Sequence, residues 1–507
     1  MKRLIYATLI FIIAICSTSL CGCMLPLLQG PTRTTGGVEY KLIGEKAAVA
    51  KYTGTSKQVT IADTYRGCPV TIIDELAFYD CTDITSVTLP DTVTTIKKNA
   101  FLRCTALETV NFSANLHAID DNAFEKCTSL TSINLPEKLN SIGIRAFADC
   151  TNLTSVIIPD TLKVICNGAF AQCEKLTTVN IPTAVTAISH SLFSGCKSLK
   201  EIRLHDSIKS ILSSAFSDCK NLTSINIPDS VTHIGAYAFN RCNNLHDVTL
   251  GDKLTKIDSF AFYGCNSLEN LIFPDSLTYI GYSAFQECTK LNGLNIPDGI
   301  TYIGRYAFLK CTNLKYTFDK HVKYLGNENN PYVALIAPYD SFANTYEINP
   351  NTKTIASYAF SECDKLTHVT IPDNVLYLGD SIFEGCDYLI SVTMSQSIPA
   401  IPNSLFKNCS RLPEFEIPDS VTRIGDNAFF SCKNLTSLII PSSVVETGSW
   451  SFQYSSKLSL YCEHTKQPNT WFNGFNYDCP VYYYSESKPT TRGNFWHYGD
   501  NGEVVVW

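Results

Sequence analysis

The stretch AFSDCKNLTSINIPDSVTHIGAYAFNRC, residues 215–242, begins and ends on the same phrase, Ala-Phe-x-x-Cys. Phe216 and Phe239 lie 23 residues apart, and so do Cys219 and Cys242. The same phenylalanine recurs with this spacing along most of the chain: Phe78, Phe101, Phe124, Phe147, Phe170, Phe193, Phe216, Phe239, Phe262, Phe285 and Phe308, then Phe360, Phe383, Phe406, Phe429 and Phe452. Self-similarity at a fixed period predicts a solenoid, in which each unit buries its apolar side chains only against its neighbours.

The residues between two phenylalanines predict the shape of one coil. The segment LTSINIP, residues 222–228, alternates as a half-buried strand does, and Pro228 closes it because proline cannot donate to a ladder. Asp229 and Ser230 suit a turn, and Gly235 permits a tight bend. AFSDC, residues 215–219, fits one short helical turn. We therefore predict a β-rich solenoid of about 17 leucine-rich coils, capped at both ends.

The full consensus LxxIxIPxSVxxIGxxAFxxC, written here from Leu222 to Cys242, resembles the BspA-like class of leucine-rich repeats. The resemblance covers roughly residues 59–462. It implies a bacterial, extracellular, non-enzymatic and adhesive protein, and some members of the class bind host matrix proteins.

Composition and motifs narrow the function classes. The chain has 507 residues, a net charge of −7 and only 17% charged residues, which argues against a basic surface for nucleic acid. The sequence contains no His-Glu-x-x-His, no Gly-x-Ser-x-Gly and no phosphate-binding Gly-x-x-x-x-Gly-Lys-[Ser/Thr]. We predict no enzyme activity, no cofactor and no metal site.

The N-terminus has the pattern of a targeting segment. Residues 1–22 join two positive charges to an apolar run and are predicted to be a lipoprotein-type signal peptide. Leu20-Cys21-Gly22-Cys23 resembles the bacterial lipobox, which would make Cys23 the lipidated residue, and residues 23–37 then form a tether. The chain would be anchored by lipid at the extracellular face of the membrane; a plain secretory signal is the alternative.

The rest of the chain divides around the repeat. Residues 38–70 are predicted to cap the first coil, residues 71–455 to form the solenoid, and the aromatic residues 456–507 to cap the other end. The period breaks between Phe308 and Phe360, which predicts an irregular coil at 314–352. A loop on a rigid solenoid is a contact site or an inert insertion, and both readings stay open.

Fifteen cysteines, from Cys81 to Cys311 and from Cys363 to Cys432, follow the repeat phenylalanine by three residues. A zinc site needs four converging ligands, whereas a ladder offers one per coil. An odd number of stacked thiols cannot pair fully, so we predict small buried thiols that complete the packing. Cys462 and Cys479 lie beyond the repeat and are candidates for a disulfide in the C-terminal cap.

Aromatic residues collect around the break in the period. Tyr279 and Tyr302 occupy the same variable position in successive coils and should stack, as should Tyr237 and Phe260. Aromatic side chains are enriched at interfaces, although ladders that only stiffen the sheet explain the same pattern. The candidate partner surface consists of Tyr237, Phe260, Tyr279, Tyr282, Tyr302, Tyr306, Tyr332, Tyr339 and Tyr358.

The sequence therefore predicts a non-enzymatic, adhesin-like binding protein of the cell surface. Its partner would be an extracellular or host protein bound along the repeat surface, and it would meet the membrane only through a lipid anchor. The alternative is a surface glycan-binding protein that uses the aromatic segment 456–507.

Overall fold

The computed structural model describes residues 34–507. Its contacts divide this part of the chain into two units, the first running to Pro228 and including Ala238–Leu245, the second made of Asp229–Tyr237 and His246–Trp507. The predicted signal peptide, Cys23 and most of the tether lie outside the described residues. Within them, no helix has the length and apolar character needed to cross a membrane.

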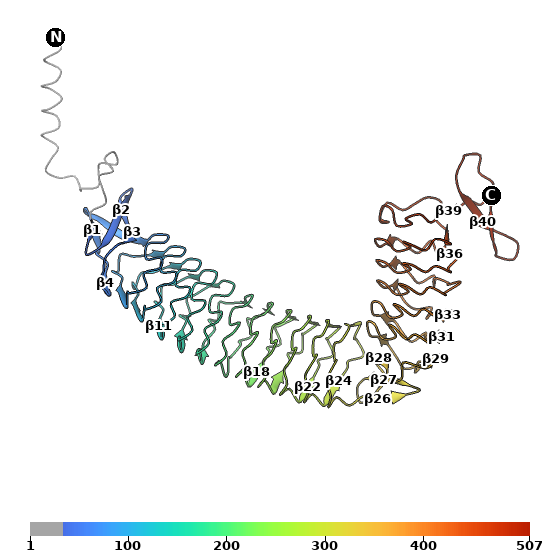
Figure 1. Cartoon of the computed structure of the whole chain (residues 1–507), viewed down its shortest axis with the longest axis horizontal. Helices are drawn as coiled ribbons and strands as arrows, with labels where there is room; N and C mark the ends of the chain where they lie inside the picture. Colours follow the sequence, from blue (N-terminus) through green and yellow to red (C-terminus); the bar gives the residue numbers. More distant parts are fainter. Residues whose placement is uncertain (1–33) are drawn as a thin grey trace, which may run out of the picture. The chain divides into compact units, whose positions relative to one another are not determined.

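Each unit is a β-solenoid, and the chain winds through about 19 turns with the predicted spacing (Figure 1). A typical coil contributes a long strand from the LTSINIP segment and a short strand from the residues before the repeat alanine. Both strands pair in parallel with their copies in neighbouring coils, so that Ile133 opposes Val156 and Ile142 opposes Ile165. The pairing partners are 23 residues apart because each side chain meets its own copy one coil further on.

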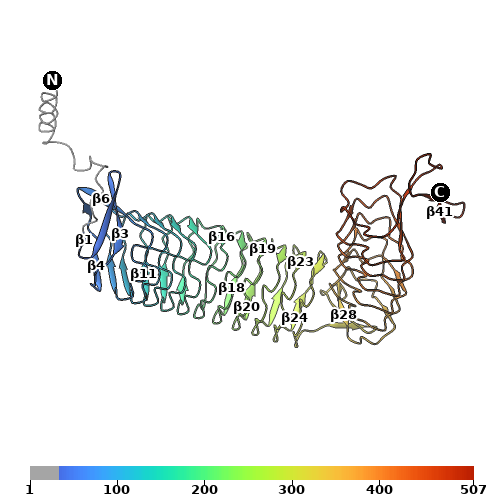
Figure 2. The ribbon, with the colours of Figure 1, turned by 45° about the horizontal axis from the view of Figure 1, so that its top comes forward.

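The first unit carries these strands in two rows (Figure 2). The long strands are β4 (Gln58–Thr60), β7 (Ser86–Thr88), β9 (Thr109–Asn111), β11 (Ser132–Asn134), β13 (Ser155–Ile157), β15 (Thr178–Val179) and β18 (Ser224–Asn226). The short strands are β8 (Thr95–Ile96), β10 (Ala118–Ile119), β12 (Ser141–Ile142), β14 (Val164–Ile165), β16 (Ala187–Ile188) and β17 (Ser210–Ile211).

The second unit repeats the arrangement. Its long strands are β20 (Asp247–Thr249), β22 (Asn270–Ile272), β24 (Gly293–Asn295), β29 (Thr345–Glu347), β31 (His368–Thr370), β33 (Ser391–Thr393) and β36 (Ser437–Ile440). Its short strands are β19 (His233–Ile234), β21 (Lys256–Ile257), β23 (Tyr279–Ile280), β25 (Tyr302–Ile303), β30 (Thr354–Ile355), β32 (Tyr377–Leu378), β34 (Ala400–Ile401), β35 (Arg423–Ile424) and β37 (Glu446–Thr447).

The Ala-Phe-x-x-Cys phrase forms a series of turns, which we call the knuckle, and the predicted short helical turn is wrong. In the coil of Phe216, Ser214 and Asp218 have left-handed φ angles of 59° and 58°. A left-handed residue interrupts any right-handed helix, and two of them flank each phenylalanine. The alternation turns every second amide toward the next coil: Phe101 N donates to Ala123 O at 2.7 Å, and Arg103 N donates to Glu125 O at 2.8 Å.

The repeat phenylalanines form a stack through each core. The rings of Phe101 and Phe124 lie 4.9 Å apart with an angle of 4° between their planes, and both side chains are fully buried. Offset-stacked rings attract one another beyond the gain from burial. One residue type at one position thus supplies both the core volume and the contact between coils.

The ladder cysteines are free thiols, and all of them except the half-buried Cys81 are buried. Cys127 Sγ donates to Phe101 O of the preceding coil at 3.2 Å. At least twelve ladder cysteines make this bond, at distances of 3.0–3.3 Å. At the next position of the ladder Ser455 takes the same role, and its hydroxyl donates to Phe429 O at 2.8 Å. These contacts confirm the packing interpretation of the thiols.

The predicted disulfide between Cys462 and Cys479 is wrong, because both are free and buried. The repeat continues for one coil more than its consensus shows. Phe475 lies 23 residues after Phe452 and packs edge-on against its ring, with 6.3 Å between centroids. Cys479 Sγ lies 3.5 Å from Phe452 O and so extends the ladder.

Strands that depart from the repeat cover the first coil. They are β1 (Thr34–Thr35), β2 (Val38–Ile43), β3 (Lys46–Tyr52), β5 (Thr64–Tyr65) and β6 (Cys68–Ile73). Tyr52 N donates to Ala77 O at 2.7 Å, and its ring stacks on Phe78 at 5.4 Å. Tyr52 therefore supplies the amide donor and the stacked ring that a preceding coil would otherwise give to the first coil.

A five-stranded sheet ends the second unit. It joins β36 to β38 (Ser459–Cys462), β39 (Val481–Tyr484), β40 (Phe495–Tyr498) and β41 (Val504–Val506). Trp496 on β40 is fully buried, and its Nε1 donates to Cys462 O at 2.9 Å. The indole gives this segment a small core of its own.

The break in the period forms a run of antiparallel pairs. Strands β26 (Thr317–Asp319) and β27 (Val322–Leu325) make a hairpin, and β27 pairs antiparallel with β28 (Ala334–Pro338). Strand β28 then pairs in parallel with β30, where the regular coils resume. We call residues 315–352 the insertion.

Candidate functional site

The nine predicted surface aromatics separate into groups, all within the second unit. Tyr279 and Tyr302 form the predicted stack, with centroids 4.7 Å apart and planes 6° apart. Both are half-buried, with Lys256 Nζ 4.8 Å from the Tyr279 ring and the Tyr302 hydroxyl donating to Asp380 at 3.4 Å. Burial raises the pKa of Tyr302 to about 12. This pair contributes to the wall of the coils more than to an open surface.

Five other aromatics form a second group, which we call the aromatic strip: Tyr237, Phe260, Tyr282, Tyr306 and Tyr358. Tyr237 stacks on Phe260 at 4.7 Å, and Phe260 contacts Tyr282 at 5.1 Å. Tyr282 meets Tyr306 edge-on at 5.9 Å. The tyrosines at 237, 282 and 306 are each about two-fifths exposed, so the strip presents aromatic side chains to solvent.

The strip uses a backbone position that is left-handed in every regular coil. Tyr237, Phe260, Tyr306 and Tyr358 all occupy the left-handed knuckle position, with φ angles of 59–62°. A left-handed residue with a side chain costs roughly 1–2 kcal/mol, and asparagine or glycine tolerates it best. Other coils place Asn122 or Gly168 at this position. The aromatics therefore lower stability there, which points to a role for the surface they create.

Arg305 joins Tyr306 to Tyr358 within the strip. Its guanidinium lies 4.4 Å from the centroid of Tyr306 and 4.0 Å from that of Tyr358. The cation is held between two ring faces, an arrangement that favours guanidinium over ammonium. The sequence reasoning missed Arg305; its position beside Tyr306, at a variable place in the coil, was the signal available.

Tyr332 and Tyr339 have different surroundings. Tyr332 is half-buried and meets Tyr324 edge-on at 5.5 Å, so it belongs to the packing of the insertion. Tyr339 is exposed and contacts Phe318 at 5.5 Å. Phe318 and Phe342 are 58% and 71% exposed, and neither was predicted. Both are aromatic residues in a segment that departs from the repeat consensus. That departure is the sequence feature from which their exposure could have been predicted.

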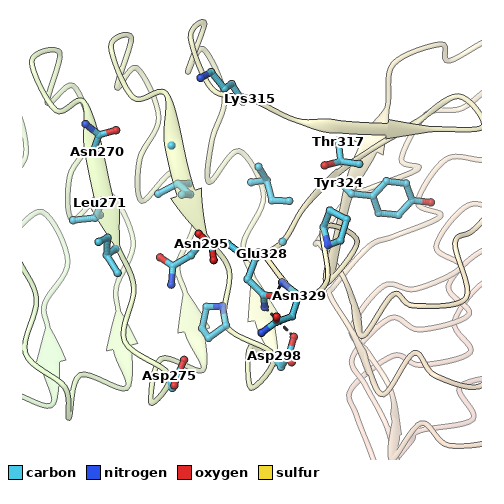
Figure 3. A pocket seen from close by; sticks show the side chains of 18 of the residues that line it. Asn270, Leu271, Asp275, Asn295, Asp298, Lys315, Thr317, Tyr324, Glu328 and Asn329 are labelled. Atoms are coloured by element: carbon cyan, nitrogen blue, oxygen red, sulfur yellow. Dashed lines mark hydrogen bonds between the residues drawn. The ribbon is translucent and has the colours of Figure 1, made fainter.

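A polar groove lies beside the long strands (Figure 3). It has a volume of about 1050 Å³ and is lined by β22, β24 and the first part of the insertion. Asp275, Asp298 and Glu328 contribute carboxylates and Lys315 the one lining ammonium. Asn327 Nδ2 donates to Asp298 Oδ1 at 3.0 Å and ties the insertion to the regular coils. The groove is thus polar and acidic, unlike the aromatic strip.

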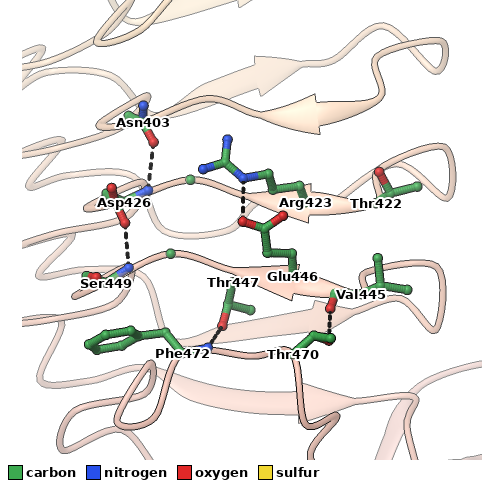
Figure 4. Close-up of polar contacts among 12 residues, drawn as sticks. Asn403, Thr422, Arg423, Asp426, Val445, Glu446, Thr447, Ser449, Thr470 and Phe472 are labelled. Carbon is green, nitrogen blue, oxygen red and sulfur yellow. Dashed lines mark hydrogen bonds and ion pairs between the residues drawn. The ribbon is translucent and has the colours of Figure 1, made fainter.

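The last regular coils show a surface whose polar groups are already paired (Figure 4). Asp426 N donates to Asn403 Oδ1 at 2.9 Å, and Ser449 N donates to Asp426 Oδ1 at 2.6 Å. Arg423 and Glu446 form an ion pair at 3.0 Å. These side chains bridge one coil to the next, so their role is structural.

The C-terminal tryptophans divide by burial. Trp471 and Trp496 are buried, and the Trp471 Nε1 donates to Val444 O at 3.2 Å. Trp450 and Trp507 are exposed, with Trp507 stacked on His497 at 3.9 Å. Two of the four indoles are therefore unable to reach a sugar. Within residues 34–507 no group of three or more metal-binding side chains comes together.

The repeat matches a known protein family. The family model described as the BspA type leucine-rich repeat region matches residues 55–177, 163–291, 210–329 and 339–459. The chain belongs to the BspA-type leucine-rich repeat family. Members of this family and its structural neighbours are typically non-catalytic.

The chain is similar to solved structures of bacterial leucine-rich repeat proteins. A leucine-rich repeat protein from Bacteroides ovatus is 25% identical, with 85% of this chain and 99% of that chain covered at a TM-score of 0.55. A leucine-rich cell surface protein from Faecalibacterium prausnitzii is 27% identical, with 87% and 96% covered at a TM-score of 0.30. None of the curated proteins matches the chain.

Proposed function

We propose that this BspA-type protein is a non-enzymatic, adhesin-like binding protein that recognises an extracellular protein. The aromatic strip and the exposed insertion residues Phe318, Tyr339 and Phe342 supply the contact surface. The observation that supports this most directly is the placing of bulky aromatics at left-handed positions, where they cost stability and remain exposed. Tyrosine and arginine are the residue types that dominate binding energy at interfaces.

Attachment to the cell surface is part of the same proposal. The Leu20-Cys21-Gly22-Cys23 pattern supports a lipid anchor on Cys23, and the family supports an extracellular location. A binding protein held by one end would present its coils to neighbouring cells or matrix. Metabolic labelling with a palmitate analogue should mark the wild-type chain and leave Cys23→Ala unlabelled; labelling of both would remove the anchor from the proposal.

A binding screen with matched variants tests the partner surface. Residues 34–507 would be assayed by surface plasmon resonance against a panel of extracellular matrix proteins. For any protein that binds, a variant with Tyr237→Asn, Tyr282→Ser and Tyr306→Asn should bind at least tenfold more weakly, because the apolar contact is removed.

The control is Tyr454→Asn, since Tyr454 is also exposed and also left-handed, with a φ of 62°, but lies outside the strip. It should bind as the wild type does. Equal loss in both variants, or loss in neither, would contradict the proposed surface.

Glycan binding by the C-terminal segment is the second candidate. The exposed Trp507 stacked on His497 offers an aromatic face of the kind that sugars pack against. A glycan-array signal that disappears in Trp507→Ala but survives in the strip variant would favour this alternative.

A further inference from the structure

The insertion leaves one knuckle without its neighbour. In the preceding coil, Ser283, Phe285 and Glu287 donate their amides to the next coil, at 2.8–3.0 Å from the accepting oxygens. In the coil of Phe308, the amides of Tyr306, Phe308 and Lys310 have no acceptor among residues 34–507. Phe308 is buried, and buried amides are nearly always paired, whereas Tyr306 and Lys310 are exposed and water reaches them. The Phe308 amide is therefore the one that calls for an acceptor.

A cavity lies against this open knuckle. Its volume is about 210 Å³, and its lining includes Tyr306, Phe308, Tyr316, Ile336 and Ala337. The walls are largely apolar, so the cavity suits a small group that has an apolar stem and a polar end.

Two cations line the same cavity. Arg305 is held between the faces of Tyr306 and Tyr358, which leaves the in-plane edge of its guanidinium available, and its Nε is buried without a hydrogen-bond partner. Lys323 lies 5.0 Å from the ring of Tyr316, and burial lowers the pKa of its ammonium group.

No carboxylate of residues 34–507 neutralises either cation. Within the described chain no carboxylate forms an ion pair with Arg305 or Lys323. A half-buried cation without a counter-ion loses hydration and gains no pairing energy in return. Two such cations beside the Phe308 amide make the lining of this cavity positive.

We propose that this cavity binds a carboxylate group carried on a short apolar stem. The free edge of the Arg305 guanidinium matches the two oxygens of a carboxylate, with Lys323 and the Tyr306 and Phe308 amides as further donors. The apolar walls contact the stem. This site goes beyond the protein-binding proposal and does not depend on it, because a small carboxylate suffices to occupy it.

Calorimetry with small acids and their amides tests the site. Residues 34–507 would be titrated with sodium butyrate and, in parallel, with butyramide, which has the same stem and no charge. Butyrate should bind and raise the melting temperature, and butyramide should do neither. Arg305→Gln and Lys323→Met should each weaken butyrate binding at least tenfold, while Lys315→Met, in the polar groove, should leave it unchanged.

Three outcomes would overturn the proposal: equal binding of butyramide, binding of inorganic phosphate at least as tight as that of butyrate, or unchanged binding in both cation variants. If Arg305→Gln fails to fold, Lys323→Met and a crystal structure with butyrate decide. A carboxylate within hydrogen-bond distance of Arg305 supports the site, and butyrate bound elsewhere refutes it.

Discussion

At the scale of the residue, the coil is defined by side chains that meet copies of themselves. Phe147 contacts Phe124 and Phe170, with ring centroids 5.2 and 5.6 Å away, and Cys150 Sγ, like most ladder thiols, donates to the phenylalanine carbonyl of the coil before. Ser455 shows that the bond, and not sulfur chemistry, is what the position requires. The thiols are therefore structural donors.

The buried thiols should make stability strongly pH-dependent above neutrality. Burial raises the pKa of Cys311 and Cys462 to about 12 and that of Cys150 and Cys242 further. An unfolded thiol titrates near 8.5, so the unfolded state loses protons first and the free energy of unfolding falls as pH rises from about 8.5 toward 12. Each thiol lowers it by at most about 1.4 kcal/mol per pH unit.

Melting temperatures between pH 7.5 and 11 measure this effect. Tyrosines with raised pKa values act in the same direction at higher pH, so a variant with Cys173, Cys219, Cys409 and Cys432 changed to serine is the control. Its melting temperature should fall less steeply than that of the wild type. If the melting temperatures of both proteins fall equally steeply with pH, the thiols do not cause the pH dependence.

The aromatics of the strip allow a second prediction at this scale. Tyr306→Asn replaces a strained left-handed tyrosine by a residue that tolerates the conformation. The variant should lose its contacts with Tyr282 and Arg305, but its backbone strain should be relieved. These two effects oppose each other, so its free energy of unfolding should stay within about 1 kcal/mol of that of the wild type. Chemical denaturation measures this; a loss of more than about 3 kcal/mol would identify Tyr306 as a core residue.

At the scale of the element, the bends between strand and knuckle depend on close approach of two backbones. Gly281 and Gly304, which hold the place of Gly235 in later coils, do not have positive φ angles. A Cβ at Gly281 would lie 2.4 Å from Ser259 N, and one at Gly304 would lie 2.5 Å from Tyr282 N. Glycine is there because the neighbouring coil leaves no room for a side chain.

Two alanine substitutions separate this cause from the general properties of glycine. Gly281→Ala should lower the free energy of unfolding by roughly 1–3 kcal/mol, because the backbone of the preceding coil must move. Gly299→Ala should be neutral or slightly stabilising, since its Cβ would meet Asp275 O at an ordinary 3.5 Å. Urea denaturation compares the two, and equal destabilisation would contradict the close-approach explanation.

At the scale of the whole molecule, stability is a sum of contacts between successive coils. Each coil bonds to the coils before and after it at the same positions, as Phe124 N does to Ala146 O at 2.7 Å. The stability of such a chain follows from nearest-neighbour terms. Loss of one complete coil from a regular region should therefore be tolerated.

Deletion of residues 132–154 removes one period and joins Thr131 to Ser155. This variant should keep the circular dichroism spectrum of the wild type and melt cooperatively, a few degrees lower. Deletion of residues 132–153 shifts the register by one residue and turns strand side chains to the wrong face, so it should unfold that region. If the two deletion variants behave alike, the register of the strands does not depend on pairing between equivalent residues of successive coils.

The sequence by itself determined everything that follows from the period: the strands, the phenylalanine stack, the stack of Tyr279 on Tyr302 and the burial of the ladder thiols. In a solenoid a residue's main neighbour is its own copy 23 positions away, so spacing in the sequence is contact in space.

Only the tertiary structure decided what breaks the period. The left-handed knuckle depends on hydrogen bonds between coils, which a five-residue phrase read alone does not reveal. The last coil around Phe475 was hidden because its sequence departs from the consensus, and the disulfide prediction failed with it. The cavity between Arg305 and Lys323 arises where a coil lacks its neighbour, and contacts in such a place follow no repeat.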